Sequence, residues 1–240
     1  MDEGVTLQVS GTHPRGLSGN WLKIIAMISM LADHIGVILL PQVGVLRMIG
    51  RLAYPIFAYM IAEGCRYTKN RALYLGQIGV LGLGCQIVCA FFANGWHLNI
   101  LITFSMAILL IYGIEGFVKN RNAFSLTVMI LTLATVGLIE LILPEIFAEQ
   151  GFHPDYGALG VMLPVLVYFA RGKWGRLFFT AIILLAMGIS SGGAQWWGLA
   201  ALPLLALYNG RRGRLRLKYL FYVFYPAHLA VLYLLDMLLG

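Results

Sequence analysis

Long apolar segments recur along the whole of this 240-residue chain, with short polar connections between them. Most of the segments are long enough to cross the hydrocarbon core of a bilayer as a helix. In lipid, backbone polar groups must be satisfied within the protein, which favours helices over open sheet. The pattern predicts an all-α integral membrane protein, a polytopic helical bundle with about nine transmembrane helices. The predicted spans are residues 21–40, 46–65, 73–93, 99–118, 123–143, 156–170, 176–191, 194–208 and 218–238.

The charge content supports this class and excludes another. Charged residues make up 11% of the chain, against about 25% in a soluble domain. The net charge of +7 is also compatible with nucleic-acid binding. The basic residues, however, stand in the short connections, where they act as topology signals. The expected partner is therefore the lipid bilayer and not a nucleic acid.

The basic residues alternate along the chain. The connections after the second, fourth, sixth and eighth predicted spans contain Lys or Arg, as Arg66, Lys69 and Arg71 do after the second. The connections between them contain neither. Because basic connections stay on the cytoplasmic side, the pattern predicts a cytoplasmic N-terminus and an outward-facing C-terminus.

The domain organisation is simple. Residues 1–20 are polar and lack the apolar core of a signal peptide. We predict a mobile N-terminal tail, followed by a single transmembrane domain over residues 21–240. Cys65, Cys85 and Cys89 lie in or beside apolar segments, and no His or acidic residue joins them at metal-ligand spacing. They predict neither a disulfide framework nor a metal site.

The first predicted span carries Lys23 at one end and Asp33 with His34 well inside. Ionisable groups are expensive at membrane depth, so they indicate a functional site by default. Lys23 and His34 are eleven residues apart, which places them on one helical face, about 16 Å apart along the axis. Met27 and Met30 lie between them on that face. A cation, an apolar track and an imidazole in this order suit a long, thin, anionic ligand that reaches into the bilayer.

The predicted topology gathers the polar residues at two depths, which predicts two binding regions joined by a path through the protein. In the outer half of the membrane it places His34, Arg51, Asn99, Thr103, Asp155, Tyr156 and His228. At the cytoplasmic side it places Lys23, Glu63, Arg66, Arg211 and Arg212. Structural interpretations compete with functional ones throughout. The structural interpretations are helix packing for His34 or His228, snorkelling for Lys23, a salt bridge between Arg51 and Asp33, and an ion pair between Glu63 and Arg66.

Several short motifs occur in a fixed order, at Leu22–Gly36, Ile49–Phe57, Glu63–Gly64, Asn99–Thr103, Asp155–Gly157 with Gly160, Tyr208–Gly210 and Phe221–His228. In order and spacing they resemble the TraX family, named for a conjugation-associated pilin acetylase, over nearly the whole chain after the tail. That family is similar to the type-three membrane acyltransferases, which have a basic residue and a histidine separated by ten residues in the first span. Lys23 and His34 match this spacing. Those enzymes more often have arginine at the first position and usually have one more span.

The resemblance implies a membrane-embedded acetyltransferase in the cytoplasmic (inner) membrane of a bacterium. Acetyl-CoA would be the co-substrate, arriving from the cytoplasm, and no metal is expected. The acceptor would be an amine or a hydroxyl, such as the N-terminus of a pilin or other peptide, or an envelope glycan. His34 would act as the general base, since imidazole titrates near neutral pH. An acetyl-histidine intermediate remains open as a second chemistry.

With this chemistry in view, we assign roles to the candidate residues. Asp33 and Arg51 join His34 in the catalytic group, with Asp33 pairing Arg51 and Arg51 stabilising the oxyanion. The predicted contacts of acetyl-CoA are Lys23, Glu63, Arg211 and Arg212. The predicted acceptor or oxyanion contacts are Asn99, Thr103, Asp155, Tyr156 and His228. The same groups would also suit a proton-coupled transporter, and a non-catalytic membrane scaffold is a third hypothesis.

Overall fold

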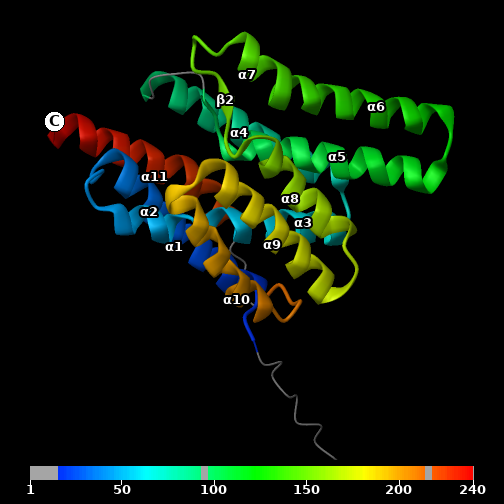
Figure 1. Cartoon of the computed structure of the whole chain (residues 1–240), viewed down its shortest axis with the longest axis horizontal. Helices are drawn as coiled ribbons and strands as arrows, with labels where there is room; N and C mark the ends of the chain where they lie inside the picture. Colours follow the sequence, from blue (N-terminus) through cyan, green and yellow to red (C-terminus); the bar gives the residue numbers. More distant parts are fainter. Residues whose placement is uncertain (1–15, 93–96, 214–217, 240) are drawn as a thin grey trace, which may run out of the picture.

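Helices account for nearly all of the structure, as the apolar pattern predicts (Figure 1). The computed structural model of the chain describes residues 16–92, 97–213 and 218–239. Most of the predicted tail, residues 1–15, lies outside these ranges. Within them, seven helices are long and apolar enough to cross a membrane. An all-α, multi-pass membrane protein is therefore confirmed, while the side of the membrane on which each end lies stays a prediction.

The elements follow the predicted spans closely. The long helices are α1 (Gly19–Ile38), α4 (Arg71–Phe92), α5 (Ile100–Asn120), α9 (Gly172–Ser191) and α11 (Lys218–Leu239). The second span is divided into α2 (Gly44–Gly50) and α3 (Ala53–Tyr67). The fifth is divided into α6 (Ala123–Gly137), a π-helical turn (Leu138–Ile142) and α7 (Leu143–Ile146). Two short strands, β1 (His97–Leu98) and β2 (His153–Pro154), pair in parallel.

Two of the nine predicted spans differ from the rest. The sixth is the short helix α8 (Gly157–Phe169), which begins after Tyr156 adopts a left-handed conformation. The eighth is a 3₁₀ segment (Gly193–Ala200) followed by α10 (Ala201–Ala206), and its first residue, Gly193, has a positive φ. Length and composition therefore support seven crossings in the described ranges, and the count of nine stays a prediction.

The break between α2 and α3 positions the first site residue. Pro55 stands in the first turn of α3 and has no backbone N–H to donate to the carbonyl of Arg51. The regular hydrogen-bond pattern of the helix is therefore interrupted at this point. Arg51 ends α2, and its side chain reaches Asp33 of α1 from the bend.

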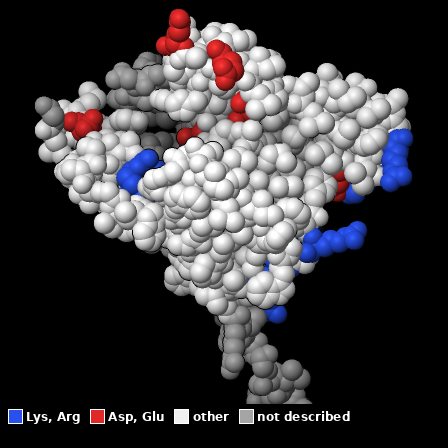
Figure 2. Space-filling view, in the orientation of Figure 1, with Lys and Arg blue, Asp and Glu red and all other residues white. Residues whose placement is uncertain are grey.

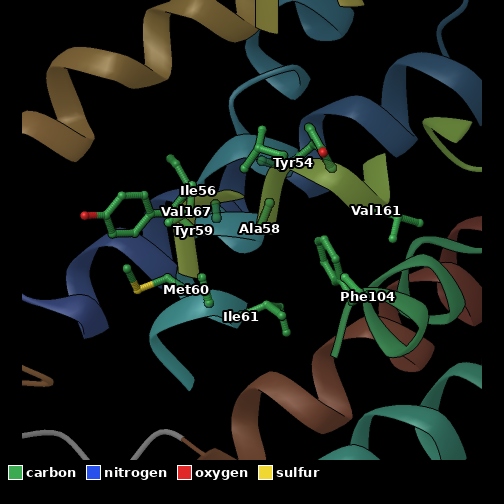
Figure 3. Packing of buried hydrophobic residues seen from close by; sticks show 14 of the residues in the cluster. Tyr54, Ile56, Ala58, Tyr59, Met60, Ile61, Phe104, Val161 and Val167 are labelled. Atoms are coloured by element: carbon green, nitrogen blue, oxygen red, sulfur yellow. The ribbon is translucent and has the colours of Figure 1, made fainter. Parts of the chain in front are cut away.

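The core is centred on α3, which packs against α1, α5 and α8. Ile56, Ala58 and Tyr59 of α3 are buried, and Figure 3 shows Ile56 and Tyr59 close to Val167 of α8. By contrast, α6 packs mainly on α5 at the edge of the bundle (Figure 1) and exposes most of its apolar surface, as a lipid-facing helix should.

The polar connections separate into two ends of the bundle. At one end, which we call the basic end, ion pairs tie the basic connections together. They include Arg71–Glu115, Arg66–Glu63 and Arg176–Glu63. At the other, the strand end, β1 and β2 join two connections that lack Lys and Arg. In Figure 2, most blue side chains lie at the right and lower right, and the most prominent red ones at the top. The connections with and without Lys or Arg, which alternate along the sequence, therefore lie at opposite ends of the bundle.

Candidate active site

Three cavities follow one another through the bundle. The histidine cavity, of about 700 Å³, lies at the strand end and is lined by His34, Arg51 and Asp155 among others. An apolar cavity of about 140 Å³ follows, and a basic cavity of about 450 Å³ lies at the basic end. Neighbouring cavities share lining residues: Met30 borders the first two, and Lys23 the last two. They therefore lie in series between the two ends of the bundle, and we call this series the route.

The predicted face of α1 lines this route. Lys23 borders the basic and apolar cavities, Met27 the apolar cavity, and His34 the histidine cavity. Met30 stands where the apolar and histidine cavities meet. The structure therefore places the cation, the apolar track and the imidazole in the order that their spacing predicts.

His34 contacts His228 of α11. Nδ1 of His34 is 2.9 Å from the carbonyl oxygen of Met30 and 3.1 Å from Nε2 of His228. Nδ1 of His228 is 2.7 Å from the carbonyl oxygen of Phe224. His228 is 7% exposed and lines none of the three cavities. It lies behind His34, so this geometry does not support the predicted contact of His228 with an acceptor.

Asp33 pairs with Arg47 of α2 and with Arg51 directly after this helix. Its carboxylate accepts from Arg51 at 2.9 Å, as predicted, and also from Arg47 at 2.9 Å. Gly50 permits this approach, because a Cβ there would lie 2.2 Å from an oxygen of Asp33. Arg51 also donates to Gln195 in the 3₁₀ segment at 3.1 Å. Sequence reasoning missed Gln195, for which the available signal is a lone amide in an apolar segment.

One donor of Arg51 is left over. Its Nε–H is buried and has no hydrogen-bond partner within the described ranges. The guanidinium carbon lies 6.0 Å from the centre of the Tyr156 ring, and the residue lines the histidine cavity. A buried donor without an acceptor costs free energy, so an oxygen of a ligand that reaches this atom would be stabilised.

The connection before α8 forms another wall of the histidine cavity. Tyr156 stacks on Tyr54 with ring centres 4.0 Å apart, and its φ of 63° lies in the left-handed region. Burial raises the pKa of Asp155 to about 6, although the charges of Arg51 and His153 oppose the shift. Both predicted residues of this connection, Asp155 and Tyr156, therefore line the cavity.

The contacts of Asn99 and Thr103 are those of structural residues. Asn99 caps the start of α5 by accepting from Leu101 at 3.0 Å, and its amide donates to the carbonyl of Gly82 at 2.8 Å. Thr103 is fully buried, lines none of the three cavities and donates to the carbonyl of Asp155 at 3.0 Å. Thr103 therefore holds the cavity wall together. Asn99 also lines the histidine cavity, so its contact with an acceptor or oxyanion stays a prediction.

Glu63 is committed to the protein at the basic end. Its carboxylate accepts from Arg176 at 2.7 Å, from Arg66 at 3.4 Å and from the Tyr208 hydroxyl at 3.2 Å. Glu63 borders the basic cavity, but an already paired carboxylate is a poor contact for an anionic ligand. The structure favours the alternative interpretation of Glu63 as an ion-pair residue.

The two arginines of the connection after α10 differ. Arg212 lines the apolar and basic cavities beside Lys23, whereas Arg211 lines none of the three. Their backbone carbonyls accept from Gly19 at 2.8 Å and from Asn20 at 2.9 Å, which fixes this connection to the start of α1. Of the predicted phosphate contacts, the structure thus brings together Lys23 and Arg212.

Sequence reasoning also missed Glu140, in the π-helical turn between α6 and α7. Glu140 is 6% exposed, and both carboxylate oxygens lack a hydrogen-bond partner in the part of the chain that the structure describes. An acidic residue inside an apolar span was the available signal. Glu140 lines none of the three cavities.

A histidine pair lies at the mouth of the route. His97 and His153 meet across β1 and β2, with Nδ1 of the first 2.8 Å from Nε2 of the second, and both line the histidine cavity. Each of the two strands has only two residues. Strands this short leave no pattern in the sequence, so the contact between these histidines could not be predicted. In the described ranges, no group of three or more His, Cys, Asp or Glu residues is placed to hold a metal ion.

Relatives of the chain are recognisable over most of its length. A family model described as TraX protein matches residues 18–236. A probable fimbrial assembly protein FimC, serogroup H1, of Dichelobacter nodosus is 27% identical over 234 residues, which cover 88% of this chain and 92% of that protein. An uncharacterized protein of Rickettsia prowazekii is 28% identical over 173 residues, which cover 70% of this chain and 62% of that protein. No solved structure matches the chain.

Proposed function

This chain belongs to the TraX family, and we propose that it is a membrane-embedded acetyltransferase that moves an acetyl group from acetyl-CoA to an amine or hydroxyl acceptor. One observation carries the proposal. A route lined by Lys23 and Arg212 at the basic end leads past Met27 and Met30 to His34. Acetyl-CoA carries the matching groups in the same order, namely anionic phosphates, a thin arm and a reactive thioester.

The donor would enter from the basic end. Lys23 and Arg212 supply positive charge for its phosphates. The apolar cavity of about 140 Å³ suits a thin chain and excludes a bulky group. The acetyl thioester would then lie at His34, where the route widens to about 700 Å³. This widening leaves room for an acceptor beside the donor.

In the histidine cavity, the acceptor must lose a proton as it attacks the thioester carbonyl. His34 takes this proton as a general base, a role that neutral imidazole fills near pH 7. The unpartnered Nε–H of Arg51 in the described structure would donate to the oxyanion that develops. Asp33 holds Arg51 in place through their 2.9 Å ion pair. The C–S bond then breaks, and the thiolate of CoA takes the proton from His34.

The acceptor that we propose is the N-terminal amine of a fimbrial or pilin-type subunit. The support for it is that one relative is named as a fimbrial assembly protein. The histidine cavity lies at the strand end, which the alternation of basic connections predicts to face outward. A hydroxyl of an envelope glycan is the other acceptor compatible with the same chemistry.

A proton-coupled transporter is the second candidate. The observation in its favour is that the route joins both ends of the bundle and is lined by His34, Arg51 and Asp155, groups that also build proton paths. The two functions differ in their products. A transporter moves its substrate unchanged, whereas an acetyltransferase forms a new bond and releases CoA.

The first test is the binding of acetyl-CoA to detergent-purified protein by calorimetry. Lys23→Ala should weaken binding about tenfold, because a charge-assisted contact to phosphate is lost. Lys173→Ala is the matched control, since Lys173 is exposed and lines none of the three cavities. Folded wild-type protein that binds no acetyl-CoA would contradict the proposal, and so would equal losses in the two variants.

A second test separates the two candidate functions. Protein in vesicles is given radiolabelled acetyl-CoA and a peptide with a free N-terminal amine. Label that becomes covalently attached to the peptide, with release of CoA, supports the acetyltransferase. Proton uptake without any labelled product would favour the transporter. A membrane scaffold would give neither result.

A further inference from the structure

His34 and His228 contact each other across the interface between α1 and α11, although they are 194 residues apart in the sequence. Each ring also points its Nδ1 at the carbonyl four residues earlier in its own helix. For His34 this carbonyl belongs to Met30, at 2.9 Å, and for His228 to Phe224, at 2.7 Å. The two histidines thus share one local geometry, and they meet through Nδ1 of His34 and Nε2 of His228.

These contacts determine which ring nitrogens carry protons. A carbonyl oxygen can only accept, so Nδ1 of each histidine is a donor. A neutral imidazole has a single N–H, so Nε2 of His228 carries a lone pair and accepts from Nδ1–H of His34, which it shares with the Met30 carbonyl. By the same rule, Nε2 of His34 carries a lone pair. That atom has no hydrogen bond to another described residue, and His34 lines the histidine cavity.

We propose that His228 is a positioning residue for the reaction at His34. By sharing the Nδ1–H of His34 with the Met30 carbonyl, it adds a second acceptor and further stabilises the tautomer in which Nε2 is the basic atom. This role rests on the proposed acetyl transfer and adds a residue to it. The opposite tautomers would place lone pairs against the carbonyl oxygens of Met30 and Phe224, which the short distances disfavour.

The surroundings of His228 suit this role. The ring is 7% exposed and lines none of the three cavities, so it touches no ligand in the route. It stacks on Phe224 with ring centres 4.8 Å apart and planes inclined by 14°. Tyr225 packs against it edge-on at 5.6 Å. This packing keeps Nε2 of His228 directed at His34.

His228 contributes most when His34 is charged. As the acceptor attacks, it forms a bond to the thioester carbon, and its proton passes to Nε2 of His34. The resulting imidazolium donates from Nδ1 to the neutral Nε2 of His228, and a charge-assisted hydrogen bond is about twice as strong as a neutral one. When the C–S bond breaks, the thiolate takes the proton from Nε2. His34 then returns to its first tautomer, and Nδ1–H stays on His34 throughout.

Two polar substitutions separate the two nitrogens of His228. His228→Gln places an amide oxygen near the position of Nε2, so it can still accept from His34. His228→Asn reaches only the position of Nδ1, so it can bond to the carbonyl of Phe224 but not to His34. We expect His228→Asn to lower kcat about 10- to 100-fold, with little change in the KM for acetyl-CoA. His228→Gln should recover most of this loss.

A second readout needs no acetyl-CoA. In ¹⁵N NMR of histidine-labelled protein in micelles, His34→Gln identifies the signals of His34. Wild type and His228→Gln should show a protonated Nδ1 and a bare Nε2 on His34. His228→Asn, in which only the Met30 carbonyl accepts from Nδ1–H, should show a smaller share of this tautomer. A wild-type His34 with its proton on Nε2 would overturn the proposal, as would equal kcat values and spectra for the Gln and Asn variants.

The acetyltransferase and the role of His228 can be tested separately. If the spectra are as expected but wild-type protein transfers no acetyl group, the proposed acetyltransferase function is contradicted. The role of His228 in that reaction is then contradicted as well. The tautomer assignment then stands. If wild-type protein is active but the Asn variant matches it in kcat and in tautomer, the acetyltransferase stands and the role of His228 falls.

Discussion

The two ends of the route hold similar clusters of charge with different surroundings. The strand-end cluster is Asp33 with Arg47 and Arg51, and the basic-end cluster is Glu63 with Arg66 and Arg176. In each, one carboxylate is shared by two arginines, and a neutral side chain joins the network. That side chain is Gln195 at the strand end and Tyr208 at the basic end.

What differs is the access to a cavity. All members of the strand-end cluster line the histidine cavity, beside His34. In the basic-end cluster Glu63 and Tyr208 border the basic cavity, but the two arginines line none of the three cavities. Arg176 instead joins α9 to α3. An ion pair that opens into a cavity can act on a ligand, whereas the same pair enclosed between helices contributes to stability.

His34→Gln should have the largest effect, because it removes the base that distinguishes the strand end from the basic end. Acetyl transfer is expected to fall about 10²- to 10⁴-fold, the usual contribution of general acid–base catalysis. Acetyl-CoA affinity should change little, since Lys23 and Arg212 are untouched. Single-turnover transfer measures the rate, and calorimetry measures the affinity. Full transfer by the folded variant would remove His34 from the mechanism.

Arg51→Lys tests the strand-end cluster itself. Lysine keeps the charge but lacks the Nε–H and the planar fork of arginine. Losing one oxyanion donor should lower kcat about 10²- to 10³-fold, with a smaller change in KM. Arg47→Lys in the same cluster is the matched control and should cost less, because the Arg47 side chain is 36% exposed against 13% for Arg51. Equal losses would mean that Arg51 has no special role.

Arg176→Lys makes the same change at the basic end. Its ion pair with Glu63 is largely buried, and loss of the fork should lower the free energy of unfolding by about 1–2 kcal/mol. Thermal unfolding in detergent measures this loss. The kcat of the folded fraction should stay at the wild-type value. A fall in kcat as large as that of Arg51→Lys would show that the two clusters do not differ in kind.

The smallest expected effect is a pH dependence at the strand end. Burial raises the pKa of Asp155 from 3.8 to about 6, so the folded state binds this proton more tightly than the unfolded chain. Asp155 therefore adds stability that is fully present below pH 3.8 and is lost as the pH rises through about 6. Asp155→Asn should flatten the melting temperature between about pH 4 and 7. An unchanged pH dependence of the melting temperature in Asp155→Asn would contradict this assignment.

The face of α1 could be predicted because helical periodicity is a local property. The spacing of Lys23, Met30 and His34 alone places them on one side of the helix, and the structure lines the route with that side. The Asp33–Arg51 pair was also accessible, since the topology brings neighbouring spans together. The capping role of Asn99 could also be predicted locally, since Asn directly before an apolar segment is a preferred N-cap.

The assignments that the geometry does not favour concern long-range contacts. The assignment of Glu63 to acetyl-CoA overlooked Arg176, 113 residues later. The assignment of His228 to an acceptor overlooked its place behind His34, because depth in a span does not determine which face of the helix meets a neighbour. Gln195 was missed for the same reason, since its partner Arg51 lies 144 residues earlier.

By itself, the sequence determined the class of the protein, the helical segments, the alternation of basic connections and the order of chemical groups along α1. These follow from hydrophobicity and helical spacing, which act over a few residues. Only the tertiary structure decided that three cavities lie in series, that a buried N–H of Arg51 has no partner among the described residues, and that His228 contacts His34. These features depend on which helix faces pack together, and packing joins residues whose separation in the chain carries no local signal.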